Sequence, residues 1–201
     1  MACDILKQYF GYSHFRLEQE AAIARLLTGD NALVIFPTGG GKSLCYQVPA
    51  LAFPLLDKQD KSRQPENAGI TLVISPLLAL MKDQVDALQK LGINAAALNS
   101  SLSREEFRGT MVRLNNGEIR LLYCAPERLD NEGFLGAIKR VRGGVRLVAI
   151  DEAHCISEWG HAFRPDYLKV ARFVDEIKAE RVVCLTAVSY THLTLPTILR
   201  V

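Results

Sequence analysis

The amino-acid sequence predicts an α/β fold, a mainly parallel sheet with helices on both faces. Short apolar runs such as residues 32–36 and 70–75 alternate along the chain with longer segments of helical periodicity. Buried parallel strands are typically continuous apolar runs, and a helix usually connects one such strand to the next. The run 32–36 leads directly into the glycine-rich stretch 38–43, and a later apolar run leads into the acidic pair Asp151 and Glu152. Ligand sites of parallel sheets lie at the carboxyl ends of the strands, so both segments are candidate site residues.

The remaining strands are expected at 94–98, 121–124, 146–150 and 182–185. Helices are expected at 17–27 with Gly29 as its C-terminal cap, from Leu44 through a kink at Pro49, at 76–91 and at 166–178. The apolar face of the 76–91 helix is expected to comprise Leu77, Leu80, Val85 and Leu88. The polar segment 57–67 is expected to be an exposed loop.

Ser103 and Glu106 have the spacing of a capping box and predict a further helix start. Phe107, Met111 and Leu114 then repeat at helical spacing, which is most simply explained as a core-facing stripe.

Composition restricts the protein class. The 201 residues fit one domain, and 49% hydrophobic and 23% charged residues are ordinary for a soluble globular protein. The net charge of +2 predicts no partner by itself, so any nucleic-acid binding must come from local patches. No apolar run approaches the ~20 residues of a membrane span, and the N-terminus lacks the pattern of a signal peptide. The five cysteines contain no C-x-x-C pair. We therefore expect no membrane association, reduced thiols and a cytoplasmic location.

The glycine-rich stretch predicts a phosphate site. Backbone N–H groups of such a turn and the dipole of the following helix both attract an anion. Lys42 would reach the β and γ phosphates, and Ser43 would bind Mg²⁺. The general P-loop pattern has a glycine where this chain has Phe36, so the match is to the end of the motif. The alternative is a plain glycine loop with a solvated lysine. The predicted loop residues are Thr38, Gly39, Gly40, Gly41, Lys42 and Ser43.

The acidic pair supplies a second half-site. Asp151 and Glu152 follow the apolar residues Val148, Ala149 and Ile150 of the expected strand, which is the form of a Walker B motif. Asp151 would hold Mg²⁺ through water, and Glu152 would orient and deprotonate an attacking water. Solvated charges at a strand end are the alternative, but two half-sites in this order favour the nucleotide interpretation.

Aromatic residues and one glutamine precede the glycine-rich stretch. Tyr12 could stack on an adenine base while Gln19 reads the hydrogen-bonding edge of the base. These residues could equally be ordinary core and surface positions.

Several segments together resemble the RecQ family of superfamily 2 DNA helicases. The resemblance rests on Asp-Glu-Ala-His at 151–154 with the aromatic-rich extension to Tyr167, and on residues 10–19, 38–47, 75–84 and 126–129. It covers roughly residues 5–187 and implies the first of two RecA-like motor domains of an ATP-dependent 3′-to-5′ helicase. It therefore implies ATP and Mg²⁺ as cofactors and single-stranded and partly duplex DNA as partners. A bacterial member would be nucleoid-associated.

The resemblance also implies individual roles. Tyr12, Arg16 and Gln19 would contact adenine, and His154 would link the ATP site to the segment after Thr186. A loop would sense single-stranded DNA and couple it to hydrolysis; its residues are Trp159, His161, Phe163 and Arg164. Ser75, Asn99 and Ser100 would touch the DNA backbone. A related superfamily 2 RNA helicase is a less favoured alternative, because the loop at 159–167 resembles that of RecQ proteins.

The resemblance ends within a motif. After Leu185-Thr186-Ala187 the chain departs from the family pattern, and residues 188–201 resemble translated adaptor sequence. We therefore expect a helicase ATP-binding domain at 1–187 and a non-native tail, the alternative being a genuine divergent C-terminus. The arginine finger of the family would lie on a missing second RecA-like domain. The chain alone is expected to hydrolyse ATP poorly, or to be a half-motor that binds nucleotide and single-stranded DNA without turnover.

Overall fold

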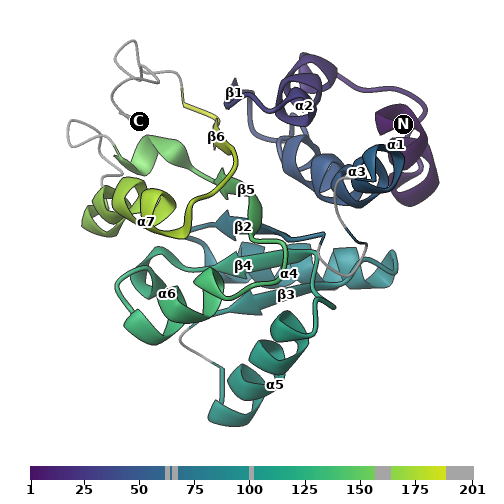
Figure 1. Cartoon of the computed structure of the whole chain (residues 1–201). Helices are drawn as coiled ribbons and strands as arrows, with labels where there is room; N and C mark the ends of the chain where they lie inside the picture. Colours follow the sequence, from purple (N-terminus) through teal and green to yellow (C-terminus); the bar gives the residue numbers. More distant parts are fainter. Residues whose placement is uncertain (62–63, 65–67, 100–101, 157–163, 189–201) are drawn as a thin grey trace.

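Six parallel strands form the centre of the computed structural model, which describes residues 1–61, 64, 68–99, 102–156 and 164–188 (Figure 1). The strands are β1 (Ala32–Ile35), β2 (Ile70–Ile74), β3 (Ala95–Leu98), β4 (Leu121–Cys124), β5 (Val145–Ile150) and β6 (Val182–Thr186). Their order across the sheet is β1-β6-β5-β2-β4-β3, and every neighbouring pair is parallel. The predicted α/β class is confirmed.

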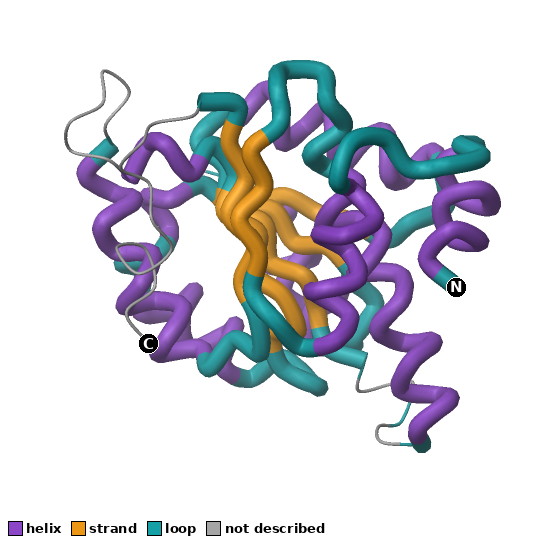
Figure 2. Tube along the Cα trace, turned by 90° about the horizontal axis from the view of Figure 1, so that it is seen from above, coloured by secondary structure: helices purple, strands orange, loops and turns teal. Residues whose placement is uncertain are grey.

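Helices cover both faces of this sheet (Figure 2). The helices are α1 (Ala2–Phe10), α2 (Gln19–Thr28), α3 (Leu44–Asp60), α4 (Leu78–Lys90), α5 (Arg104–Asn115), α6 (Glu132–Lys139) and α7 (Val170–Ile177). Alternate strand residues point to opposite faces. Val73 and Tyr123 therefore pack in the core with α2, α3 and α4, whereas Leu72 and Leu122 pack with α5, α6 and α7.

The predicted helix bounds needed small corrections. The helix expected from residue 17 begins at Gln19, because Leu17 has φ of 50° and lies outside helical geometry. Its predicted cap is confirmed, with Gly29 in the left-handed conformation. The segment 166–178 begins with a 3₁₀ turn, Pro165–Lys169, before α7. Helices α1 and α6 were not predicted.

The apolar face predicted for α4 is partly wrong. Leu77 and Leu80 are 44% and 37% exposed, and Met81 is fully buried beside Val85 and Leu88. The helix begins at Leu78 rather than Pro76, and positions 81, 85 and 88 then form one stripe at helical spacing.

The capping box of α5 is confirmed. The Ser103 hydroxyl accepts a bond from the Glu106 N–H at 3.2 Å, and the Glu106 carboxylate accepts one from the Ser103 N–H at 2.9 Å. The bond from the Ser103 backbone N–H and, secondarily, hydrogen bonding by the Ser103 side chain lower the pKa of the Glu106 carboxyl. Of the predicted core stripe, Leu114 is buried, while Phe107 and Met111 are only partly buried at the core surface.

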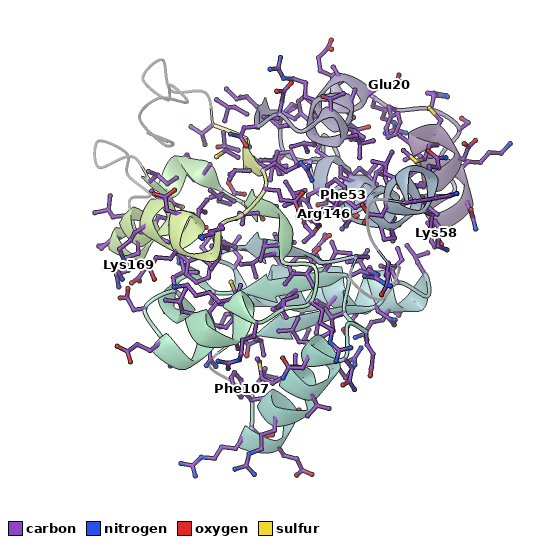
Figure 3. The ribbon with its side chains drawn as sticks, viewed as in Figure 1. Glu20, Phe53, Lys58, Phe107, Arg146 and Lys169 are labelled. Carbon is purple, nitrogen blue, oxygen red and sulfur yellow. The ribbon has the colours of Figure 1, made fainter. Side chains whose placement is uncertain are left out.

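The prediction of an exposed loop at 57–67 is wrong for its first residues. Helix α3 continues to Asp60, and Asp57 is 3% exposed. The reason is a buried partner: Asp57 Oδ2 lies 2.6 Å from Arg146 Nη1, and Arg146 Nε also reaches Glu180 at 3.0 Å. The Arg146 guanidinium lies 4.9 Å from the centre of the Phe53 ring (Figure 3). This cluster ties α3 to the amino end of β5.

All five cysteines are free, and four of them are buried. Within the described ranges, none of the helices is long and apolar enough to span a membrane.

Replacing Asp57 by alanine is expected to lower the free energy of unfolding by about 3 kcal/mol, because it leaves the buried Arg146 charge short of a partner. Urea unfolding followed by circular dichroism measures the change. The control is Asp86→Ala on the exposed side of α4, which should stay within about 0.5 kcal/mol of the parent. A loss below about 1 kcal/mol for Asp57→Ala would mean that Glu180 alone compensates Arg146.

Candidate nucleotide-binding site

The polar segments that follow the strands meet at one edge of the sheet, because all six strands are parallel. The glycine-rich stretch follows β1, and Asp151 follows β5. Strand β6 lies between them and ends at Thr186, while β2 lies on the other side of β5 and leads into Ser75. The predicted half-sites therefore follow β1 and β5, which are separated in the sheet by the single strand β6.

The glycine-rich stretch forms a tight turn. Gly39 and Gly41 have φ of 79° and 73°, which side chains with a Cβ rarely adopt. At Gly40 the constraint is space, because a Cβ would lie 2.9 Å from the Pro37 carbonyl oxygen. Lys42 donates hydrogen bonds from Nζ to the carbonyl oxygens of Phe36 and Pro37, at 3.1 and 3.4 Å. The lysine is thus held against the turn.

Helix α3 begins directly after the turn, as predicted. Ser43 is its N-cap residue, and the Ser43 hydroxyl does not cap the helix. The first N–H groups of α3 therefore lie next to the turn, where they and the helix dipole favour an anion.

Gln19 joins the N-terminal segment to the turn. Its side-chain amide donates to the carbonyl oxygens of Gly41 and Gly40 at 2.9 and 3.3 Å, and its Oε1 accepts from the Arg16 N–H at 2.8 Å. It is only 2% exposed, whereas Tyr12 is 50% exposed. The role of Gln19 in reading adenine stays a prediction. Its observed hydrogen bonds fix the position of the glycine loop relative to the start of α2.

A small pocket of about 100 Å³ lies between these segments. The predicted adenine residues Tyr12, Arg16 and Gln19 line it together with the loop glycines Gly39, Gly40 and Gly41. His14 and Leu44 line it too, and neither was predicted. His14 lies within the aromatic segment that drew attention to Tyr12, which is the signal that could have identified it.

Asp151 occupies the opposite side of the site. Its Oδ1 accepts from the Glu152 N–H at 3.0 Å, and its Oδ2 accepts from the Ser75 hydroxyl at 3.2 Å. The Tyr167 hydroxyl donates to its backbone carbonyl at 2.8 Å. Burial and, secondarily, the neighbouring Glu152 charge raise the pKa of Asp151, while the positive charge of Lys42 opposes this shift.

Glu152 and His154 connect Asp151 to β6. Glu152 has φ of 50°, a sparsely populated conformation that occurs often at functional sites. Its carboxylate lies 3.1 Å from His154 Nδ1, which also lies 3.0 Å from the Thr186 hydroxyl. Thr186 is fully buried and was not itself predicted as a site residue. A hydroxyl residue at the end of a buried strand is its sequence signal.

The side chains fit a magnesium–nucleotide complex. Ser43 and Asp151 offer the oxygen ligands that Mg²⁺ prefers, and Lys42 offers a phosphate-binding cation. Among the described residues no group of three acidic, histidine or cysteine side chains could hold a metal alone. This suits Mg²⁺, which usually combines one or two protein ligands with waters and substrate phosphates.

The structure describes only part of the predicted DNA-contacting set. Ser75 is 2% exposed and bonded to Asp151. Asn99 directly follows β3, and its backbone carbonyl accepts a hydrogen bond from Arg128 Nη2. Arg164 Nη1 donates to the Pro76 carbonyl at 3.4 Å. Ser100, Trp159, His161 and Phe163 lie outside the described residues, so their DNA contacts stay predictions.

Comparison with known proteins places the chain among helicases. The sequence model of the family described as DEAD/DEAH box helicase matches residues 16–192. The chain is 45% identical over 186 residues to the ATP-dependent DNA helicase RecQ of Haemophilus influenzae, covering 92% of this chain and 28% of that protein. RecQ of Bacillus subtilis is 47% identical over 189 residues, covering 92% and 29%. The chain thus spans less than a third of the length of these relatives.

Solved structures show the same fold at lower identity. The Mycobacterium smegmatis helicase Lhr bound to single-stranded DNA and AMP-PNP has a TM-score of 0.64 and 20% identity, covering 93% of this chain and 25% of that one. The helicase MrfA has a TM-score of 0.65 and 16% identity, covering 94% and 29%. At this identity the likeness concerns the fold.

Replacing Asp151 by asparagine is expected to raise the thermal unfolding midpoint by roughly 2–4 °C at neutral pH. The raised pKa of Asp151 means that the folded chain binds the proton more tightly than the unfolded chain, so ionised Asp151 costs stability at neutral pH. The gain should shrink as the pH falls and Asp151 becomes protonated.

Differential scanning calorimetry across a pH series measures this difference. Asp83→Asn, an exposed position on α4, is the matched control and should show no gain. A lower midpoint for Asp151→Asn at neutral pH would contradict the burial argument.

Proposed function

The chain belongs to the DEAD/DEAH box helicase family, and from this membership we propose that it is the ATP-binding half of a 3′-to-5′ DNA helicase motor. In the complete protein, hydrolysis of Mg-ATP would be coupled to movement along single-stranded DNA and to unwinding. The observation that carries this proposal is that the loop of Lys42 and the carboxylate of Asp151 follow parallel strands at the same edge of the sheet. The lysine charge there opposes the raised pKa of the carboxyl.

Each site residue has a part in this proposal. Lys42 and the loop N–H groups would hold the β and γ phosphates, and Ser43 and Asp151 would hold the metal ion. Bound Mg²⁺ would neutralise charge that develops on the phosphate oxygens. Glu152 would orient the attacking water and accept its proton, while the bonds of Glu152 to His154, and of His154 to Thr186, restrict the orientation of the carboxylate.

The adenine base would lie at the pocket beside Tyr12. Half of the Tyr12 side chain is exposed, so the ring offers a surface for stacking, and Arg16 and Gln19 line the same pocket. The bonds from Gln19 to the glycine loop would make occupancy of the base pocket and the shape of the phosphate loop interdependent.

DNA would bind along the same sheet edge, at Asn99, Ser100, Arg164 and the aromatic residues Trp159, His161 and Phe163. Stacking of unpaired bases on aromatic side chains contributes roughly 1–3 kcal/mol each. Arg164 would transmit such binding, because it contacts the segment after β2 through Pro76 while Ser75 contacts Asp151. A protein with this substrate would be located with the cellular DNA, in the nucleoid if it is bacterial.

A second motor domain would complete the catalytic centre in the proposal, since the chain spans 28% of the length of RecQ of H. influenzae. An arginine finger supplied by such a domain is worth roughly 10³–10⁵ in turnover. Without it, the chain would act as a half-motor that binds nucleotide and single-stranded DNA with little turnover.

Replacing Lys42 by alanine is expected to weaken binding of a non-hydrolysable ATP analogue by roughly 10- to 100-fold, because charge-assisted bonds to phosphate contribute about 1.5–3 kcal/mol. Isothermal titration calorimetry with Mg²⁺ measures the affinity. Lys58→Ala removes an exposed lysine near the other end of α3 and should leave it unchanged. Equal affinities for parent and Lys42→Ala would refute the phosphate assignment.

Replacing Tyr12 by alanine is expected to weaken ATP binding about tenfold through lost stacking, while binding of inorganic triphosphate stays the same. Competition of both ligands against a fluorescent nucleotide separates the two effects. If ATP and triphosphate weakened equally, Tyr12 would act on the phosphate loop and not on the base.

The isolated chain is expected to show little ATP turnover and no unwinding. Addition of the second motor domain of a RecQ protein should raise DNA-stimulated turnover by roughly 10³-fold or more, and Lys42→Ala should abolish the gain. Stimulation by RNA as strong as by DNA would favour the RNA helicase alternative. Strong Lys42-dependent unwinding by the chain alone would contradict the half-motor interpretation.

A further inference from the structure

A pocket of about 580 Å³ opens between α5 and α6, at the β3 side of the sheet and separate from the nucleotide pocket. Its walls come from one face of α5 along its whole length, the turn after β4 and α6. Four arginines line it: Arg104, Arg108, Arg128 and Arg140. None of its lining residues is acidic. The net charge of the whole chain is only +2, so this pocket is a concentrated positive site.

The positive charge is not neutralised by nearby carboxylates. In the part of the chain that the structure describes, none of the four arginines forms an ion pair with an acidic side chain. Glu106 on α5 is held at the N–H of Ser103. Asp130, next to the pocket in sequence, pairs instead with Lys169 and Arg172 on the α7 side. An anionic ligand is therefore the electrostatic complement of the pocket.

The pocket also has an apolar surface. Phe107 and Met111 on α5 line it and are only partly buried. Figure 3 labels Phe107. The Arg128 guanidinium lies 5.5 Å from the centre of the Phe107 ring, which orders both side chains. A flat ring that contacts the Phe107 and Met111 side chains would bury apolar area that now faces solvent. The ligand should thus combine a planar apolar group with negative charges.

Arg128 connects this pocket to the predicted DNA-contacting segment. Its Nη2 donates to the carbonyl of Asn99, and the lining residues Leu102 and Ser103 follow shortly after Ser100. A single DNA strand that touches Asn99 could therefore continue into the pocket.

We propose that this pocket is a further single-stranded DNA subsite, which seats one base against Phe107 and Met111 and neighbouring phosphates against Arg104, Arg108 and Arg140. It rests on the proposed function, because it extends the path of the same DNA. An acidic peptide with an aromatic anchor has similar chemistry, but the bond from Arg128 to Asn99 favours the DNA strand.

Fluorescence anisotropy with a labelled oligothymidylate tests this subsite. The double variant Arg108→Gln, Arg140→Gln removes two exposed charges of the pocket and is expected to weaken binding at least tenfold. It should also lower the slope of log affinity against log salt by about 1.4, since each phosphate contact on single strands contributes about 0.7. Arg142→Gln, an exposed arginine outside the pocket, is the matched control and should bind like the parent.

A photocrosslink locates the base. An oligonucleotide that carries 5-iododeoxyuridine should crosslink to the α5 peptide at Phe107 or Met111 in the parent chain, and much less in the double variant. Unchanged unfolding midpoints ensure that the variants are compared as folded chains. Phe107→Leu keeps an apolar side chain and should lose about tenfold in affinity through lost stacking.

The outcomes separate this proposal from the proposed function. If the parent binds the oligonucleotide and the double variant binds it equally well, the subsite is overturned and the helicase proposal stands. Crosslinks confined to other peptides overturn it in the same way, as does an acidic aromatic peptide that binds the pocket without competing with DNA. If the parent binds no single-stranded DNA even at low salt, the DNA part of the proposed function fails and the subsite fails with it.

Discussion

The parallel direction of all six described strands is the constraint on which the site depends. Parallel strands bring their carboxyl ends to one edge, so residues that are more than a hundred positions apart in sequence become neighbours there. The turn that holds Lys42 and the carboxylate of Asp151 meet for this reason. The two helical layers that cover the sheet keep its strands buried, and the buried Arg146 cluster ties α3 to β5 from the opposite end.

The candidate site contains two features that lower the stability of the folded chain. Asp151 is a partly buried carboxylate beside a second acid, and its raised pKa reflects an unfavourable charge. Glu152 occupies a backbone conformation that non-glycine residues rarely adopt. A bound cation would relieve the first of these costs, because it favours the ionised carboxylate. A site of this kind would be stabilised by its ligand, which is expected of the nucleotide-dependent motor proposed above.

The contacts along the sheet edge suggest how the proposed ligands would influence each other. Gln19 bonds to the glycine loop, Ser75 bonds to Asp151, and Arg164 bonds to the segment that Ser75 begins. Farther along, Arg128 bonds to Asn99 and lines the arginine pocket. The Gln19 bond joins the start of α2 to the loop after β1, and each of the other contacts joins segments that follow two different strands. This contiguity is a physical basis for coupling, and only the measurement of linked affinities demonstrates coupling itself.

The sequence by itself determined the fold class and the strand ends at which both candidate half-sites lie. Continuous apolar runs, a glycine-rich turn and adjacent carboxylates after a strand are local signals. They predicted that residues 39–43 and 151–152 lie at the same edge of a parallel sheet, where the structure has them. The capping box at Ser103 and Glu106 is likewise local, and it was predicted and found.

Only the tertiary structure decided which polar residues are buried and what they contact. Asp57 was expected in an exposed loop, yet Arg146, 89 residues later, holds it in the interior. Gln19 and Thr186 bond to residues of other segments, and the four pocket arginines come from α5, the turn after β4 and the C-terminal end of α6. Contacts between distant segments depend on strand order and helix packing, which no local pattern of residues encodes.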